Sequence, residues 1–279
     1  MKSDDWFSKL VGKLVRTADY MSSILRQNYT MAERVNLVRA SVSRGHETKL
    51  LNFRVTYLSE GAFRTQLREI FFEGEYRFDA ETESPVILDC GANIGLATLF
   101  FKHLYPKSRI TSFEADPTTA STLQKNIEQN HLQDVSAYNL FLSDTEGDYP
   151  FYVAANVAGS LRMSADPSRI SKHREIIVKA GKLSHYIEGP VDLLKMDVEG
   201  AELDVMTDLK SSGKLSLVRR MVIEYHHRIG GQASCLAGFL ALLEEEGFEY
   251  QIAGAGCDPI TRQGVFQDIL IGAYRPSPA

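Results

Sequence analysis

The stretch Val86-Ile-Leu-Asp-Cys-Gly-Ala-Asn-Ile-Gly95 decides the fold of this chain. It starts as an apolar strand over 86–89, turns at Gly91 and Gly95, and runs into a helical segment over 96–104. Glycine lacks a Cβ and adopts positive φ, so the turn lets a ligand approach the backbone, and the helix N-terminus favours negatively charged groups. The spacing Gly91-x-x-x-Gly95 differs from the Gly-x-Gly-x-x-Gly fingerprint of dinucleotide sites. We therefore expect a nucleotide-like ligand without a pyrophosphate, with a purely structural turn as the alternative.

Downstream of this stretch, short β-rich runs alternate with helical segments, as is typical of a doubly wound α/β sheet. We expect further strands at 109–114, 135–142, 191–197, 217–225, 248–253 and 266–274. Helices are expected at 96–104, 117–129, 201–209 and 234–246, with Pro117 as a first helical residue and Gly247 as a helix stop. A segment at about 149–187 interrupts the alternation and is interpreted as an inserted ribbon or flap. The sequence predicts a Rossmann-like domain over 58–279.

The first 57 residues differ in character from the rest of the chain. Apolar residues recur at helical spacing over 6–15, and a second helix is expected at about 21–43. A short strand from Phe53 to Tyr57 and a helix over 62–72 follow. Residues 1–54 hold ten Lys/Arg and five Asp/Glu, in contrast to the acidic remainder. We interpret residues 1–57 as a helical N-terminal extension with a basic, solvated face. A homodimer formed through these helices is compatible with the pattern, although no motif specifies it.

Composition limits the classes of function. The 279 residues are 44% hydrophobic and 24% charged, with a net charge of −5, which does not favour nucleic acid as a partner. Three widely spaced cysteines fit neither a disulfide framework nor a Cys-x-x-Cys metal site and indicate a reducing compartment. No run of about 18 apolar residues occurs, and Asp4 and Asp5 lie where a secretory leader would be basic and then apolar. We expect a cytoplasmic protein without stable membrane insertion.

Acidic residues lie at the ends of the second and third strands. Glu114 comes 23 positions after Gly91, where the ribose of a nucleoside would present its hydroxyls, and a carboxylate accepts hydrogen bonds from both. Glu114 is therefore predicted to anchor a cofactor. Ser143 and Asp144 follow the third strand beside the same crevice and are candidates for contact with an adenine edge. The alternative for these two residues is an ordinary turn.

The ends of the fourth and fifth strands carry the candidate acceptor site. Asp197 and Glu199 close the fourth strand at the edge where open α/β sheets bind ligands, although they also suit a helix N-terminus. Alternation on the fifth strand predicts that Glu224 and His226 share one side, while His227 faces the other.

These motifs resemble those of class I S-adenosylmethionine-dependent methyltransferases, and more narrowly the FkbM-type O-methyltransferases. The resemblance covers roughly 58–274 and rests on the stretch over 86–95 and on Phe113-Glu-Ala-Asp-Pro117, Leu194-Lys-Met-Asp-Val-Glu-Gly-Ala-Glu202 and Val222-Ile-Glu-Tyr-His-His227. It implies a seven-stranded sheet with the last strand antiparallel and S-adenosylmethionine lying across the carboxyl ends of the first strands. It also implies a small-molecule hydroxyl acceptor on a sugar, a polyketide or another secondary metabolite.

The resemblance also assigns roles to particular residues. It places Asp89, Gly91, Asn93 and Gly95 near the methionine part of the cofactor, Glu114 on the ribose, and Ser143 or Asp144 near the adenine. The turn Gly159-Ser160-Leu161 resembles a small-residue motif of the family, so Ser160 is a candidate for lining the acceptor pocket, with a plain hairpin turn as the alternative. Glu199, Glu224 and His227 are further candidates for binding the acceptor.

Methyl transfer is an in-line displacement at a sulfonium, so the protein mainly aligns the partners and removes the proton of the acceptor. Alignment alone lowers the activation barrier by about 7 to 11 kcal/mol when the attack geometry is fixed. We predict that His226 is the general base, because an imidazole titrates near neutrality, and that Asp197 orients it or replaces it as base. A divalent cation held by Asp197, Glu224 and His226 is the alternative, which we do not expect to apply.

Three other classes of function remain as alternatives. An NAD(P)-dependent oxidoreductase shares the strand-turn-helix and the acid after the second strand, but not the glycine spacing. A methyltransferase acting on nucleic-acid bases would require a basic face, which the acidic core lacks. A non-catalytic module that keeps the cofactor fold for binding is the third class, against which the retained Asp197, Glu224 and His226 argue.

Overall fold

The computed structural model describes residues 27–154, 173–227, 229, 235–254 and 267–276. The helix expected over 6–15, the turn at Ser160 and the third cysteine, Cys257, lie outside these residues. The chain divides into two compact units, Met1–Phe78 and Asp79–Ala279. No helix within the described ranges has both the length and the apolar composition needed to cross a membrane.

The first unit combines helices with a β-hairpin. Helix α2 (Met31–Ser41) begins at a capping box, in which Thr30 and Glu33 satisfy each other's backbone N–H groups. Strands β1 (Glu47–Leu50) and β2 (Phe53–Thr56) pair antiparallel, and helix α3 (Glu60–Gln66) continues into a π-helix over Leu67–Glu73. Strand β1 was not expected, because its Glu-Thr-Lys sequence lacks apolar alternation.

The boundary between the units also differs from the expected one at 57/58. The ring of Tyr57, which follows β2, stacks on Phe63 of α3 with the centroids 4.4 Å apart. Both rings are buried, so α3 packs against the end of the hairpin. The first compact unit extends to Phe78.

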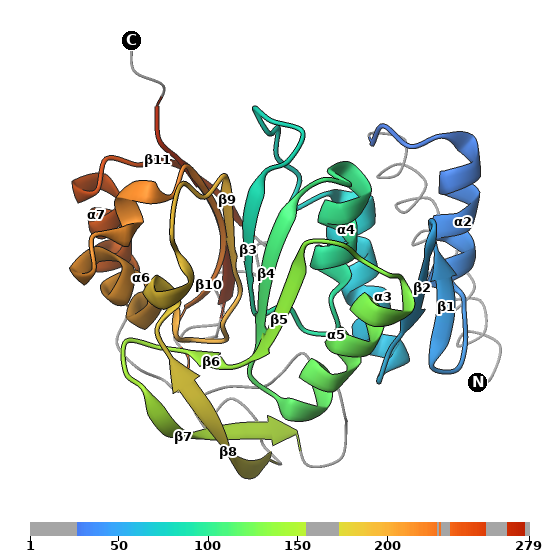
Figure 1. Ribbon diagram of the computed structural model, residues 1–279, viewed down its shortest axis with the longest axis horizontal. Coiled ribbons are helices and arrows are strands. Elements are labelled where there is room, and N and C mark those ends of the chain that lie inside the picture. Colours follow the sequence, from blue (N-terminus) through green and yellow to red (C-terminus); the bar gives the residue numbers. More distant parts are fainter. Residues whose placement is uncertain (1–26, 155–172, 228, 230–234, 255–266, 277–279) are drawn as a thin grey trace, which may run out of the picture. The chain divides into compact units, whose positions relative to one another are not determined.

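The second unit is built on a seven-stranded sheet with the order β11-β12-β10-β9-β3-β4-β5 (Figure 1). The strands are β3 (Val86–Cys90), β4 (Arg109–Glu114), β5 (Val135–Asn139), β9 (Leu193–Met196), β10 (Arg220–His227), β11 (Glu249–Gly254) and β12 (Gln267–Tyr274). The last strand, β12, is antiparallel to both of its neighbours, and the pairs among β3, β4, β5, β9 and β10 are parallel. The predicted fold class is confirmed.

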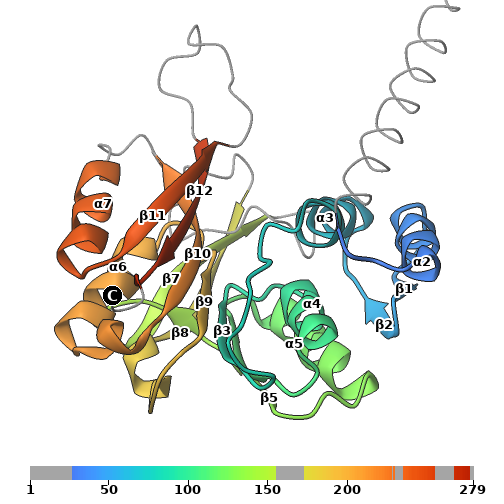
Figure 2. The same ribbon diagram turned by 90° about the horizontal axis from the view of Figure 1, so that it is seen from above.

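Helices cover both faces of this sheet, as Figure 2 shows. Helices α4 (Leu96–Leu104) and α5 (Pro117–Gln129) lie on one side of the sheet, and α6 (Glu202–Ser211) and α7 (Leu236–Glu245) lie on the other. Pro117 is the first residue of α5 and Asp116 its N-cap, while Gly247 adopts a φ of +78° after α7, as predicted. The sheet is therefore doubly wound.

The expected inserted segment contains an antiparallel ribbon. Strands β7 (Gly147–Ala154) and β8 (His173–Gly181) pair with each other, and the short strand β6 (Phe141–Leu142) pairs parallel with β8. The single strand expected over 135–142 is therefore split between two sheets. The split occurs where Asn139 donates its side-chain amide to the carbonyls of Glu114 and Ala115, after which the ring of Phe141 packs in the ribbon against Phe151.

Candidate active site

The turn after β3 is shaped by close contact with the loop after β9. Gly91 has a φ of +76°, and a Cβ at this position would lie 1.7 Å from the carbonyl oxygen of Asp197. No other residue type fits here, because both the backbone conformation and the contact exclude a side chain. The ends of β3 and β9 are thereby held together.

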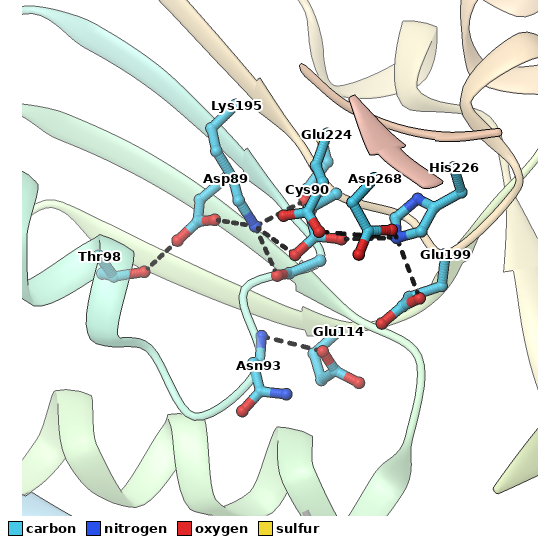
Figure 3. Close-up of polar contacts among 12 residues, drawn as sticks. Asp89, Cys90, Asn93, Thr98, Glu114, Lys195, Glu199, Glu224, His226 and Asp268 are labelled. Carbon is cyan, nitrogen blue, oxygen red and sulfur yellow. Dashed lines mark hydrogen bonds and ion pairs between the residues drawn. The ribbon is translucent and has the colours of Figure 1, made fainter. Parts of the chain in front are cut away.

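A buried lysine reinforces this contact. Lys195 of β9 donates from Nζ to the carbonyls of Cys90 and Gly91, at 3.1 and 2.7 Å, and lies 3.4 Å from Asp89 Oδ1 (Figure 3). Burial disfavours its charge, yet the carboxylates of Asp89 and Asp197 raise the pKa of Lys195 above its usual value. The lysine is therefore a fixed cation beneath the turn.

Glu114 at the end of β4 holds the other end of the turn. Its two carboxylate oxygens accept the backbone N–H groups of Asn93 and Asp116, each at 2.9 Å. Burial raises the pKa of Glu114 to about 7 despite these hydrogen bonds. Asn93 has a φ of +50°, a left-handed conformation that asparagine tolerates better than most residues. Glu114 is thus placed beside the glycine turn.

His226 on β10 lies at the centre of a group of carboxylates. Its Nδ1 is 2.7 Å from Oε1 of Glu202, which is buried at the start of α6. Its Nε2 faces carboxylate oxygens of four residues: Glu199 (3.2 Å), Asp197 (3.7 Å), Asp268 (3.8 Å) and Glu224 (3.9 Å). We call these four residues and His226 the His226 cluster. Figure 3 shows Glu199, Glu224 and Asp268 directed toward the ring.

The local fold explains why these side chains converge. Glu224 and His226 are two residues apart on β10 and share a side of the strand, as alternation predicts. Asp268 is the antiparallel partner of His226 on β12. Glu199 reaches the ring from the loop after β9, where it has a φ of +58°. A non-glycine residue held in this conformation is often found at functional sites.

The charges of the cluster influence one another. Repulsion from Asp197, together with burial, raises the pKa of Glu224 to about 9. Glu202 behaves in the opposite way, because His226 lowers the pKa of Glu202 although burial opposes its charge. Glu202 and His226 therefore form a buried hydrogen-bonded pair, whereas Glu224 lies among carboxylates that favour its protonated form.

Sequence comparison assigns the chain to a family. The Methyltransferase FkbM domain matches residues 89–250, which include both the glycine turn and the His226 cluster except Asp268. The chain belongs to the FkbM methyltransferase family. It is similar to Methyltransferase 1 of Beauveria bassiana, with 30% identity over 65% of this chain and 79% of that protein. It is also similar to Methyltransferase sdnD of Sordaria araneosa, with 29% identity over 70% of this chain and 86% of that protein.

Two further similarities concern a named reaction and a solved structure. The 2-O-methyltransferase NoeI of Sinorhizobium fredii is 28% identical over 52% of this chain and 65% of that protein. The structure of methyltransferase FkbM from Methylobacillus flagellatus covers 94% of this chain and 60% of that chain, with 14% identity and a TM-score of 0.46. Because the chain belongs to a methyltransferase family, the alternative of an NAD(P)-dependent oxidoreductase is no longer supported.

Within this FkbM domain, two of the predicted residues lie outside the His226 cluster. Asp89 is fully buried and accepts a hydrogen bond from Thr98 at 2.7 Å, so its carboxylate faces the interior and Lys195. His227 points to the other side of β10, where its ring lies near Tyr225, and it is not part of the His226 cluster. Alternation along β10 predicts this orientation.

Three further predicted residues follow β3 and β6, which belong to different sheets. Gly95 is the N-cap of α4 with a φ of +91°, and Ser143 and Asp144 follow β6, with Ser143 buried. Sequence reasoning missed Glu202 and Asp268. Glu202 was the last residue of the 194–202 motif, which was a usable signal, whereas Asp268 carried no signal because its position depends on the register of β10 and β12.

Proposed function

We propose that this methyltransferase uses S-adenosylmethionine to methylate a hydroxyl of a small molecule. The observation that carries the proposal is the arrangement around the glycine turn. Glu114 holds Asn93 at one end of the turn, and Gly91 at the other end packs against Asp197 of the His226 cluster. A cofactor gripped by Glu114 would therefore extend toward a group of acids and an imidazole.

The proposed cofactor site uses groups whose geometry suits a nucleoside. Each carboxylate oxygen of Glu114 has two lone pairs and accepts one backbone N–H, which leaves acceptor capacity for the two ribose hydroxyls. The backbone between Gly91 and Gly95 would adjoin the methionine part, and Ser143 or Asp144 the adenine. We propose that Asp89 acts on this site indirectly, by holding Lys195 under the turn.

The chemistry required of the protein is alignment and proton removal. When bound, S-adenosylmethionine would supply the methyl group and a sulfur leaving group, and the proton of the acceptor hydroxyl would pass to the protein. His226 is our candidate for the base, since Glu202 accepts from Nδ1 and leaves Nε2 directed toward the crevice. Asp197 is the alternative base, while Glu199 and Glu224 would contact the acceptor.

The nature of the acceptor is supported by one relative. The name of NoeI states a 2-O-methyl transfer, and this fits our proposal of oxygen as the methylated atom. We propose a sugar, a polyketide or a similar secondary metabolite as the acceptor, with Ser160 as a candidate for lining its pocket. The acidic surroundings of the site do not favour a nucleic-acid substrate.

Calorimetry with S-adenosylhomocysteine tests the cofactor site. We expect binding by the wild type and at least tenfold weaker binding by Glu114→Ala, because two hydrogen bonds to the ribose are lost. Glu114→Gln keeps the shape of the side chain and guards against misfolding. Glu128→Ala, an exposed change on α5, should bind like the wild type. Absence of binding by the wild type would refute the proposed site. So would binding by Glu114→Ala and Glu114→Gln with the affinity of the wild type.

The role of the base is tested separately. A His226→Ala variant is expected to retain affinity for S-adenosylhomocysteine but to lose at least a hundredfold in methyl transfer, the contribution usual for a general base. The assay uses S-adenosylmethionine with a labelled methyl group and a panel of glycosides and hydroxylated polyketides. Full transfer by this variant would remove His226 from the reaction, and no transfer to any acceptor by the wild type would favour the non-catalytic class.

A further inference from the structure

The His226 cluster places several carboxylates around one imidazole nitrogen. Four carboxylates face a single imidazole nitrogen within 3.9 Å. The nearby Lys195 is 3.9 Å from Asp197 Oδ2, but its ammonium already donates to two carbonyls and lies closer to Asp89. A divalent cation among these carboxylates would offset their mutual repulsion.

The donor atoms are arranged as a cation would require. Asp197, Glu199 and His226 offer three ligand atoms that all lie within 4.8 Å of one another, and so do Glu224, His226 and Asp268. Two ligands bound to one ion at about 2.0 to 2.3 Å are separated by no more than about 4.6 Å, so small side-chain movements bring these atoms into range. The two sets share His226, which makes a single ion the simplest occupant.

Two further observations point to this position. The Oδ1 atom of Asp197 is buried and makes no hydrogen bond to any residue in the described part of the chain. The imidazole is oriented from behind by Glu202, whose side chain is 2% exposed and lies 2.7 Å from Nδ1. A carboxylate that fixes the far nitrogen of a histidine in this way is characteristic of histidine ligands to metals.

We propose that the His226 cluster binds a divalent cation through His226 Nε2 and carboxylate oxygens of Asp197, Glu199, Glu224 and Asp268. A donor set rich in carboxylates favours hard ions of the Mg²⁺ and Mn²⁺ type, and the imidazole favours Mn²⁺ of the two. The proposed binding of the ion depends only on the arrangement of these donor atoms. Its catalytic role rests on the proposed function, and with the ion bound His226 would be a ligand and not the base. The ion would bind the acceptor hydroxyl and lower its pKa, and the proton would pass to a cluster carboxylate.

Titration of metal-free protein with MnCl₂, followed by electron paramagnetic resonance of the free ion, tests this proposal. We expect one Mn²⁺ per chain and at least tenfold weaker binding in Glu199→Gln and Asp268→Asn. Each variant removes one charge with little change of shape, and circular dichroism checks that it folds. Glu83→Gln is the matched control, since Glu83 pairs only with Lys107 among the described residues and is exposed. We also expect Mn²⁺ to raise the melting temperature of the wild type and of the control, and much less that of the two variants.

The outcomes separate this proposal from the proposed function. A wild type that binds S-adenosylhomocysteine but none of Mn²⁺, Mg²⁺ and Ca²⁺ would overturn the cation site and leave the cofactor site intact. A wild type that binds Mn²⁺ at this cluster but no S-adenosylhomocysteine would overturn the proposed function alone. Equal Mn²⁺ affinity in the wild type, Glu199→Gln and Asp268→Asn would place the ion elsewhere and refute the proposal.

Discussion

At the scale of single residues, Gly91 connects the two halves of the site. Its φ of +76° and the contact that an added Cβ would make with the Asp197 carbonyl impose separate costs on any replacement. The left-handed conformation costs about 1 to 2 kcal/mol for a residue with a Cβ. The clash at 1.7 Å adds to this cost, because the opposing atom belongs to the backbone and cannot rotate away.

We predict that Gly91→Ala lowers the free energy of unfolding by at least about 3 kcal/mol, the range of strongly disruptive changes. Gly213→Ala is the control, since Gly213 has a similar φ of +72° but no atom within 4 Å of the added Cβ. It should lose only about 1 to 2 kcal/mol. Urea denaturation measures both values, and equal losses would show that the contact with Asp197 does not matter.

The raised pKa of Glu114 predicts how cofactor affinity changes with pH. Because this pKa is about 7, the carboxyl is largely protonated at pH 6 and largely ionised at pH 8. An ionised carboxylate accepts from both ribose hydroxyls, so affinity for S-adenosylhomocysteine should rise from pH 6 to pH 8. The rise should be much smaller in Glu114→Gln, which does not titrate. Calorimetry at the two pH values measures this, and an identical rise in both proteins would rule out Glu114 as its source.

The same group has a predictable effect on stability without the cofactor. A folded pKa raised above the unfolded value, which is about 4.3, means that the folded chain binds more protons between pH 4.3 and pH 7. The contribution of Glu114 to stability is therefore present below pH 4.3 and is lost as the pH rises toward 7. Denaturation midpoints of the wild type should decline relative to those of Glu114→Gln over this window, and a relative increase would contradict the assignment.

At the scale of elements, the start of α5 depends on one side chain. Asp116 accepts from the backbone N–H of Thr119 at 2.8 Å and also from its hydroxyl at 2.7 Å. We predict that Asp116→Ala lowers the free energy of unfolding by about 1 kcal/mol, the usual cost of losing an N-cap. Thr118→Ala, an exposed change in the same turn, should cost much less. Similar losses in the two variants on urea denaturation would argue against the cap.

Helices and strands were predictable from the sequence where apolar runs and capping residues match the fold around them. Strand β4 has the predicted bounds, and Pro117 begins α5 as expected, because apolar runs and capping residues act over short distances. The division of 135–142 into β5 and β6 was not predictable. It depends on Asn139 bonding to carbonyls that lie 24 and 25 positions earlier in the chain.

At the scale of the whole molecule, the sequence predicted only those site residues whose positions follow from the order of the strands. Parallel strands place their carboxyl ends at one edge, and so the proximity of Glu114, Asp197 and His226 to the glycine turn followed from the sequence. Asp268 could not be placed, since it enters through the antiparallel register of β12 against β10. Likewise, the stacking of Tyr57 on Phe63, which joins α3 to the hairpin, depends on ring packing that the sequence pattern does not encode.

A crystal structure of the protein with S-adenosylhomocysteine tests the central claim most directly. We predict that the ribose hydroxyls donate to Glu114, that the amino-acid part lies along the turn from Gly91 to Gly95, and that the sulfur faces the His226 cluster. A cofactor bound away from Glu114, or one whose sulfur points away from His226, would contradict the account.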